Sequence, residues 1–178
     1  MNTSRIDIHL DRLAGNLASL QTSLTPSTAL VLVVKADAYG HGLTPVATQA
    51  AASGVKWFAV AYLHEALAVR AVAPEAEIVI LGAVGAEDVS LLVENRILPI
   101  LVNEEHGRSL ASAAQQAGCT LHAHLKVDTG MGRFGVAWPE AVATYERLAV
   151  LPGLQITGVC THFASVEPRK PSLGPDQM

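Results

Sequence analysis

Short apolar runs alternate along the chain with segments whose apolar residues recur every three or four positions. The runs are typical of buried strands, and the periodic segments are typical of amphipathic helices. The predicted strands cover residues 29–35, 57–60, 77–81, 98–102, 121–127 and 155–162. The predicted helices cover residues 11–24, 44–53, 63–72, 86–95, 104–117 and 138–149. Because the strands are almost continuously apolar and each is followed by a helix, the pattern indicates a parallel sheet covered on both faces.

Two α/β architectures fit this alternation, a doubly wound open sheet and a (β/α)8 TIM-type barrel. Six predicted strands are fewer than the eight of a closed barrel, so a barrel would stop before closure. Residues 166–178 have the composition of a loop-like tail, and residues 5–10 alternate apolar and polar like one further half-buried strand. We therefore expect one incomplete domain over residues 1–178.

Composition narrows the class of protein. Half of the chain is hydrophobic and only 4% is aromatic, which favours helix–sheet layers built from Ala, Val and Leu. A net charge of −4 gives no support for nucleic-acid binding, which needs a clustered basic surface. There is no signal-peptide pattern and no apolar run of the roughly 20 residues that span a bilayer. Cys119 and Cys160 lack metal-ligand spacing, so we expect reduced thiols in the core of a cytoplasmic protein without a membrane partner.

Lys35 ends an apolar predicted strand and leads into a glycine-containing turn. Desolvation of a lysine makes its neutral amine available for Schiff-base chemistry, although its position alone favours a lysine that merely reaches solvent at a strand end. The segment Val-Val-Lys-Ala-Asp-Ala-Tyr-Gly-His-Gly at 33–42 closely resembles the cofactor-lysine signature of alanine racemases. The resemblance implies that Lys35 forms an aldimine with pyridoxal 5′-phosphate and is one of two catalytic bases, and that Tyr39 helps to hold the cofactor phosphate.

A glycine-rich stretch follows the strand predicted at 121–127. Gly130, Gly132 and Gly135 form a G-x-G-x-x-G pattern, but the next predicted strand ends in Cys-Thr-His, without the acidic residue of a dinucleotide site. The sequence Lys-Val-Asp-Thr-Gly-Met-Gly-Arg at 126–133 resembles a second alanine racemase signature. The resemblance implies that Arg133 is catalytic, contacting the cofactor's phenolic oxygen and the substrate carboxylate. From its position alone, Arg133 would be a solvated surface charge.

Lys126 lies on the same face of its predicted strand as His122 and His124, because strand side chains alternate. If this face is interior, Lys126 is a second buried lysine close to Arg133. The resemblance to the family implies that Lys126 is carbamylated, which would make it an anion that orients the arginine. The two histidines are interpreted as core residues and not as metal ligands, since no carboxylate or cysteine shares their motif, and no metal is expected.

The segment Val-Cys-Thr-His-Phe-Ala-Ser at 159–165 resembles the Thr-His-Phe-Ala segment of the same family. It implies that His162 packs against the pyridine ring, and Leu81 matches an apolar residue that lines the pocket. All three motifs fall at the carboxyl ends of predicted parallel strands, so we expect them on one rim.

The resemblance extends from residue 6 to about residue 165. It implies an N-terminal barrel portion, truncated after about the sixth strand, of an alanine racemase that uses pyridoxal phosphate to interconvert L- and D-alanine for peptidoglycan. The family is homodimeric, and its second base is a tyrosine from a C-terminal β domain that this sequence lacks. We therefore expect weak or no activity from the chain alone.

Three alternatives stay open at this point. The first is a single-domain pyridoxal-phosphate carrier or homeostasis protein, against which the run at 37–42 argues. The second is a fragment that keeps the fold and binds nothing. The third is a serine or broad-specificity amino-acid racemase, because substrate choice depends largely on residues outside this chain.

Overall fold

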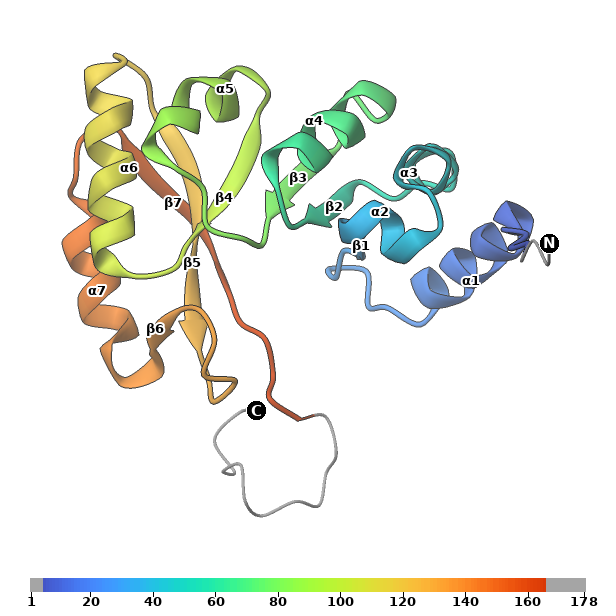
Figure 1. Cartoon of the computed structure of the whole chain (residues 1–178). Coiled ribbons are helices and arrows are strands. Elements are labelled where there is room, and N and C mark those ends of the chain that lie inside the picture. Colours follow the sequence, from blue (N-terminus) through green and yellow to red (C-terminus); the bar gives the residue numbers. More distant parts are fainter. Residues whose placement is uncertain (1–4, 166–178) are drawn as a thin grey trace. The chain divides into compact units, whose positions relative to one another are not determined.

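The apolar runs of the sequence form short parallel strands, and helices follow them along the chain (Figure 1). The structure is a computed structural model that describes residues 5–165. The chain divides into two compact units, residues 1–81 and 82–178. In the described part of the chain, no helix combines the length and apolar character needed to cross a membrane.

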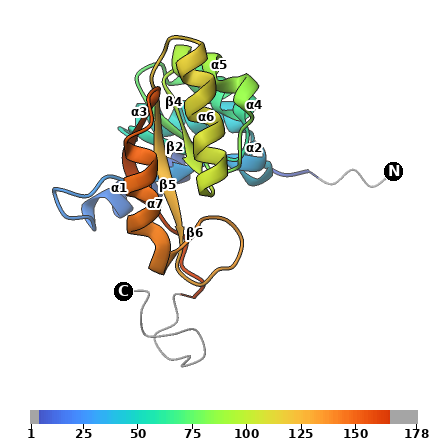
Figure 2. The ribbon, with the colours of Figure 1, turned by 90° about the vertical axis from the view of Figure 1, so that its left-hand side faces the viewer.

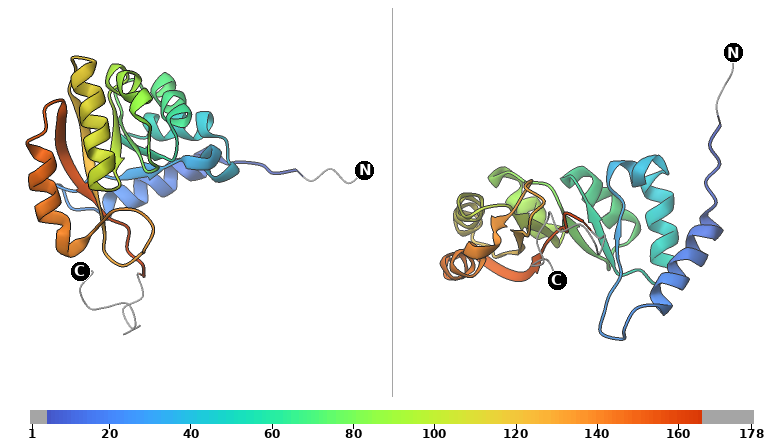
Figure 3. Two further views of the ribbon diagram at one scale, coloured as in Figure 1. Left: turned by 60° about the vertical axis from the view of Figure 1, so that its left-hand side comes forward. Right: turned by 90° about the horizontal axis from the view of Figure 1, so that it is seen from below.

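The first unit is built on three parallel strands, β1 (Val31–Val33), β2 (Trp57–Val60) and β3 (Glu77–Ile80), with β2 in the middle. Its helices are α1 (Leu10–Thr22), α2 (Lys35–Gly40), α3 (Leu43–Ala52) and α4 (Leu63–Val72). Helix α3 packs between α1 and α4, as the right-hand view of Figure 3 shows. The core of this unit consists of fully buried apolar side chains, among them Leu17, Ala47, Phe58, Ile78 and Ile80.

The second unit has β5 (Leu121–Asp128) as its central strand, paired in parallel with β4 (Ile97–Leu101) and β7 (Leu154–Cys160). The two-residue strand β6 (Val136–Ala137) pairs with the end of β5. Its helical segments are η1 (Ala86–Asp88), α5 (Val89–Glu94), α6 (Glu104–Gln116), η2 (Trp138–Glu140) and α7 (Ala141–Ala149).

Helices α6 and α7 run side by side over the β4–β5–β7 sheet (Figure 2). The Glu104 carboxylate joins them, because it makes ion pairs of 2.7 Å with both Arg108 on α6 and Arg147 on α7. These two ion pairs hold the pKa of Glu104 below its ordinary value, with Arg147 contributing most.

The predicted parallel α/β architecture is confirmed, and each predicted strand and helix within it is present with boundaries shifted by a few residues. The strand predicted at 5–10 is wrong. Residues 5–9 form no regular structure, and α1 begins at Leu10. The side chain of Ile6 is 82% exposed, so the alternating pattern finds no apolar layer to bury against. The loop-like tail predicted at 166–178 lies outside the described residues, and a single incomplete domain stays a prediction.

Candidate functional site

The chain turns sharply where β1 ends at the predicted cofactor lysine. The backbone N–H of Val34 donates to the carbonyl of Ala59 on β2 at 2.9 Å, and Lys35 then begins α2. The next four residues, Ala36, Asp37, Ala38 and Tyr39, have φ values between 52° and 56°, in the left-handed region. This conformation costs non-glycine residues roughly 1–2 kcal/mol each. The turn after Lys35 therefore needs specific interactions to hold it.

Two carboxylates hold this left-handed turn. At its entrance, Oε1 of Glu65 accepts a hydrogen bond of 2.6 Å from the backbone N–H of Ala36. At its exit, Oδ1 of Asp37 accepts a hydrogen bond of 2.6 Å from the backbone N–H of Leu43, the first residue of α3. Hydrogen bonds to charged acceptors are stronger than neutral ones, so these two contacts oppose the conformational cost.

The predicted residues of the first unit lie at the carboxyl edge of its sheet. Lys35 follows β1 and is half-buried, and its amine makes no hydrogen bond or ion pair with the other described residues. Leu81 directly follows β3, where its N–H donates to the carbonyl of Val60 at 2.7 Å, and its side chain is half-buried. The side chain of Tyr39 is 60% exposed. Lys35 and Leu81 thus occupy the edge at which α/β proteins place their sites.

In the second unit, the glycine-rich stretch forms a turn that folds back onto Asp128. Its carboxylate accepts hydrogen bonds of 2.9 Å from the N–H groups of Gly130 and Gly132. These bonds, first that of Gly130 and then that of Gly132, hold the pKa of Asp128 below its ordinary value. The amides that would bind a pyrophosphate are thus occupied by a side chain of the same loop, which agrees with the rejection of a dinucleotide site.

Gly135 is required by close packing at the end of this turn. Its φ is +118°, and a Cβ built at this position would lie 2.7 Å from the backbone nitrogen of Asp128. Its own N–H donates to the carbonyl of Val102 at 3.2 Å. The third glycine of the pattern therefore lets the returning chain approach the backbone of β5.

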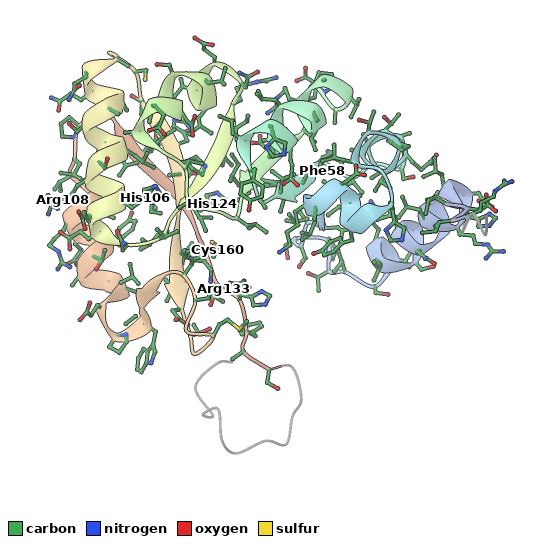
Figure 4. The ribbon with its side chains drawn as sticks, in the orientation of Figure 1. Phe58, His106, Arg108, His124, Arg133 and Cys160 are labelled. Carbon is green, nitrogen blue, oxygen red and sulfur yellow. The ribbon has the colours of Figure 1, made fainter. Side chains whose placement is uncertain are left out.

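Arg133 and His162 both lie just beyond the carboxyl ends of strands in the second unit. Arg133 is exposed on the loop after β5, beyond Cys160 (Figure 4), and makes no hydrogen bond or ion pair with the other described residues. His162 is exposed two residues after β7. The Thr161 hydroxyl links the segment after β7 to the segment after β5. It donates to the carbonyl of Val127 at 2.9 Å and lies 2.8 Å from the hydroxyl of Thr129.

Lys126 is buried on β5, with only 8% of its surface exposed, although His122 on the same face of the strand is exposed. Its amine donates to the carbonyl of Val127 at 3.2 Å. Burial lowers the pKa of Lys126, whereas the charges of Cys160 and Asp128 oppose this shift and that of Arg133 adds to it. Burial also raises the pKa of the Cys160 thiol. Both Cys160 and Cys119 are free thiols, but they are half-buried and not core residues as predicted.

The interpretation of His122 and His124 as core residues is wrong. His122 is exposed and His124 is half-buried. Along β5 the residues on the opposite face, Leu121, Ala123 and Leu125, are buried instead. Across residues 5–165, no group of three His, Cys, Asp or Glu side chains gathers as a metal site would require.

Glu65 is a site residue that the sequence reading missed. It is only 6% exposed, and its carboxylate accepts three backbone N–H groups. The signal in the sequence was its position three residues after Tyr62, the spacing of a helix capping box. Tyrosine in place of the usual serine or threonine hid that signal.

In each unit, parallel strands are followed at their carboxyl ends by polar side chains, Lys35 in the first unit and Arg133 and His162 in the second, as in α/β proteins that build sites at such edges. The model of the alanine racemase N-terminal domain family matches residues 8–177, and the chain belongs to this family. The chain is 41% identical over 160 residues to the alanine racemase of Treponema pallidum, covering 88% of this chain and 42% of that protein. The predicted resemblance is therefore confirmed.

Two solved structures resemble the chain in fold. The alanine racemase from Bartonella henselae with covalently bound pyridoxal phosphate superposes with a TM-score of 0.78 at 25% identity, covering 88% of this chain and 46% of that one. The histidine racemase from Leuconostoc mesenteroides superposes with a TM-score of 0.79 at 27% identity, covering 88% and 42%. The chain thus spans less than half the length of these relatives. The meeting of the three motifs on one rim stays a prediction.

Proposed function

We propose that this chain forms the cofactor-binding part of a pyridoxal-phosphate-dependent racemase that interconverts L- and D-alanine. The observation that carries the proposal is the position of Lys35, half-buried at the carboxyl end of β1 with an amine that no described residue occupies. The relative from T. pallidum bears the name alanine racemase, and the structure from B. henselae holds pyridoxal phosphate covalently. Both support this assignment.

The residues present fit this cofactor. Lys35 offers a primary amine for covalent attachment to the aldehyde, and Tyr39 offers an exposed side chain for the phosphate. In the second unit, Arg133 offers a guanidinium without a described partner, suited to a phenolic oxygen or a carboxylate. By the family resemblance, His162 would pack against the pyridine ring and Leu81 would line the pocket.

Bound pyridoxal phosphate supplies an electron sink that stabilises negative charge on the α-carbon of an amino acid. Lys35, as a neutral amine, would remove the α-proton from its side of the α-carbon in one direction of the reaction, and as the resulting ammonium would supply the proton on that side in the reverse direction. Arg133 would bind the substrate carboxylate and so orient the α-carbon. Inversion also needs a base on the opposite side. The family resemblance assigns that base to a C-terminal domain of the partner in a homodimer, so we expect weak or no turnover by residues 1–178 alone.

Lys126 is proposed to carry a carbamate that orients Arg133. Its burial lowers its pKa and so increases the share of the neutral amine that reacts with CO2. No described carboxylate pairs with Arg133. A crystal grown at neutral pH should show the carbamate as additional density on Lys126. Density for an ordinary amine, with another anion paired to Arg133, would contradict this part of the proposal.

The cofactor assignment is tested by mixing the purified protein with pyridoxal phosphate, reducing with borohydride and mapping the modified peptide. We expect the label on Lys35, its loss in Lys35→Ala and its retention in Lys56→Ala, which removes an exposed lysine of the same unit. A label that survives Lys35→Ala would overturn the assignment.

Substrate choice is tested by following α-proton exchange of alanine, serine and histidine in deuterated water. Preference for alanine supports the proposal. Preference for serine, or for histidine as in the name of the L. mesenteroides relative, would show that alanine is not the preferred substrate. Tight cofactor binding with no exchange of any amino acid by the full-length gene product would favour a carrier protein.

We place the activity in the cytoplasm, where D-alanine would be made for peptidoglycan.

A further inference from the structure

We propose that Glu65 is a positioning residue for Lys35, acting through the backbone that carries it and not through the reacting atoms. The inference rests on the proposed function of Lys35. Glu65 is the third residue of α4, and its side chain reaches the ends of two strands at once. It thereby joins the segment after β1 to the segment after β2.

The Glu65 carboxylate makes one hydrogen bond to the lysine segment and two to the neighbouring loop. Oε1 accepts from the N–H of Ala36 at 2.6 Å. Oε2 accepts from the N–H of Ala61 at 2.8 Å and from the N–H of Tyr62 at 3.1 Å. A side chain that is only 6% exposed is thus satisfied by three donors of its own unit.

These amides need an acceptor because the strand ladder ends just before them. Val34 makes the last bond from β1 to β2, through its N–H and the carbonyl of Ala59. The chain then enters the left-handed turn, where the N–H of Ala36 finds no backbone carbonyl and bonds to Glu65 instead. Ala61 and Tyr62 directly precede α4, with Tyr62 as its N-cap residue, so their N–H groups lie beyond the ends of both β2 and the helix. One carboxylate therefore serves both gaps.

Lys35 lies between two fixed amides. The N–H before it, that of Val34, is tied to β2, and the N–H after it, that of Ala36, is tied to Glu65. The Cα of Lys35 therefore cannot shift without breaking one of two hydrogen bonds. A reacting amine must be held near its working geometry, so a tether on the adjacent amide is of direct use to the proposed chemistry.

Charge and shape both favour glutamate for this task. A carboxylate accepts at two oxygens, whereas the amide of glutamine accepts at one and turns an NH2 donor toward a backbone N–H. The positive end of the α4 dipole also favours an anion at the third helical position. Glu65→Gln therefore keeps size and polarity while it removes the acceptor on one side.

The test uses protein without cofactor, so that its result does not depend on cofactor binding. Amide hydrogen exchange of Ala36, Ala61 and Tyr62 and the rate of amine labelling of Lys35 are compared in the wild type, Glu65→Gln and Glu65→Ala. Glu77→Gln serves as the matched control, because Glu77 is an exposed glutamate of the same unit. Circular dichroism and the unfolding transition show whether each variant is folded.

We expect exchange at Ala36 to accelerate about 10- to 100-fold in a folded Glu65→Gln protein. Lys35, which is half-buried, should be labelled about threefold faster or more, relative to exposed Lys56. Glu77→Gln should change neither rate. If Glu65→Ala does not fold, the Gln variant still decides the question. Unchanged exchange at Ala36, or a Lys35 rate that shifts no more than in Glu77→Gln, overturns the positioning role.

The same variants separate this inference from the proposed function. If the wild type forms no borohydride-reducible adduct on Lys35, the proposed function fails, while the exchange and labelling rates still establish or refute the tether. If the wild type forms the adduct, Glu65→Gln should shift the pH dependence of the adduct's absorbance, a readout that a stability effect alone leaves in place. An unshifted pH dependence would contradict the positioning role.

Discussion

Lys126 and Cys160 are register partners in the parallel pairing of β5 and β7. Burial lowers the pKa of the lysine and raises the pKa of the thiol, so it favours the neutral form of each. Their mutual attraction as ions opposes both shifts, but burial is the larger cause for each group. The lysine and the thiol thus lie side by side at the carboxyl ends of β5 and β7.

In buffer freed of CO2, where Lys126 keeps its free amine, Lys126→Met is expected to raise the free energy of unfolding at pH 7 by about 1 kcal/mol, because the ammonium is buried at a cost. The sign with pH follows from the lowered pKa. Between that folded pKa and the ordinary value of 10.5, the unfolded chain binds more protons, so wild-type stability rises with pH and the advantage of the variant shrinks. Denaturant unfolding of the wild type and Lys126→Met from pH 6 to pH 10.5 measures the gain in stability and its change with pH. The exposed Lys56→Met is the control, and an advantage that grows with pH would contradict the interpretation.

Asp128→Asn is expected to loosen the glycine-rich turn. The lowered pKa means that the carboxylate's contribution is present above the ordinary value of 3.8 and is lost as pH falls through the folded pKa below it. In NMR titrations, the amide resonances of Gly130 and Gly132 should therefore follow a midpoint below 3.8 in the wild type and show no such step in Asp128→Asn. Exchange of these two amides should accelerate about tenfold at neutral pH. A midpoint above 3.8 would show that the carboxylate does not accept these bonds.

Gly135→Ala is expected to lower the free energy of unfolding by about 2–4 kcal/mol, because the new Cβ meets backbone atoms of β5 in a conformation that alanine avoids. Gly118→Ala provides the comparison within the same unit. Its φ is also positive, but a Cβ there meets nothing within 4 Å, so only the conformational cost of about 1 kcal/mol applies. Urea unfolding of the two variants measures the difference. Equal losses would mean that the close approach to Asp128 does not matter.

The sequence pattern predicted an element correctly where its structure depends on residues close together in the chain. Helix α4 spans 63–72 as predicted, because its apolar period and its ends lie within the segment itself. The left-handed turn could not be foreseen, since Ala, Asp and Tyr favour other conformations and the turn depends on Glu65, 29 residues further along the chain. The same limit explains Ile6, whose alternating pattern fits a strand only where a partner exists. The motifs therefore pointed to Lys35, but not to the carboxylate that holds the turn after it.

Ala36→Gly tests whether the turn after Lys35 is strained. Ala36 is exposed and has a φ of 52°, so glycine removes the conformational cost without loss of buried surface. We expect the free energy of unfolding to rise by about 1 kcal/mol. The same substitution at Ala18, an exposed residue within α1 of the same unit, should lower it by about 1 kcal/mol, because glycine disfavours a right-handed helix.

The opposite signs of these two changes make the comparison decisive. Both remove one exposed methyl group and both add the same freedom to the unfolded chain, so the difference between them reports the native backbone alone. Urea unfolding of the two variants, each with borohydride mapping of the Lys35 adduct, measures stability and cofactor binding together. A loss of stability in Ala36→Gly as large as in Ala18→Gly would show that residues 36–39 are not left-handed. A gain in stability with slower adduct formation would show that the strain helps to hold Lys35 for its reaction.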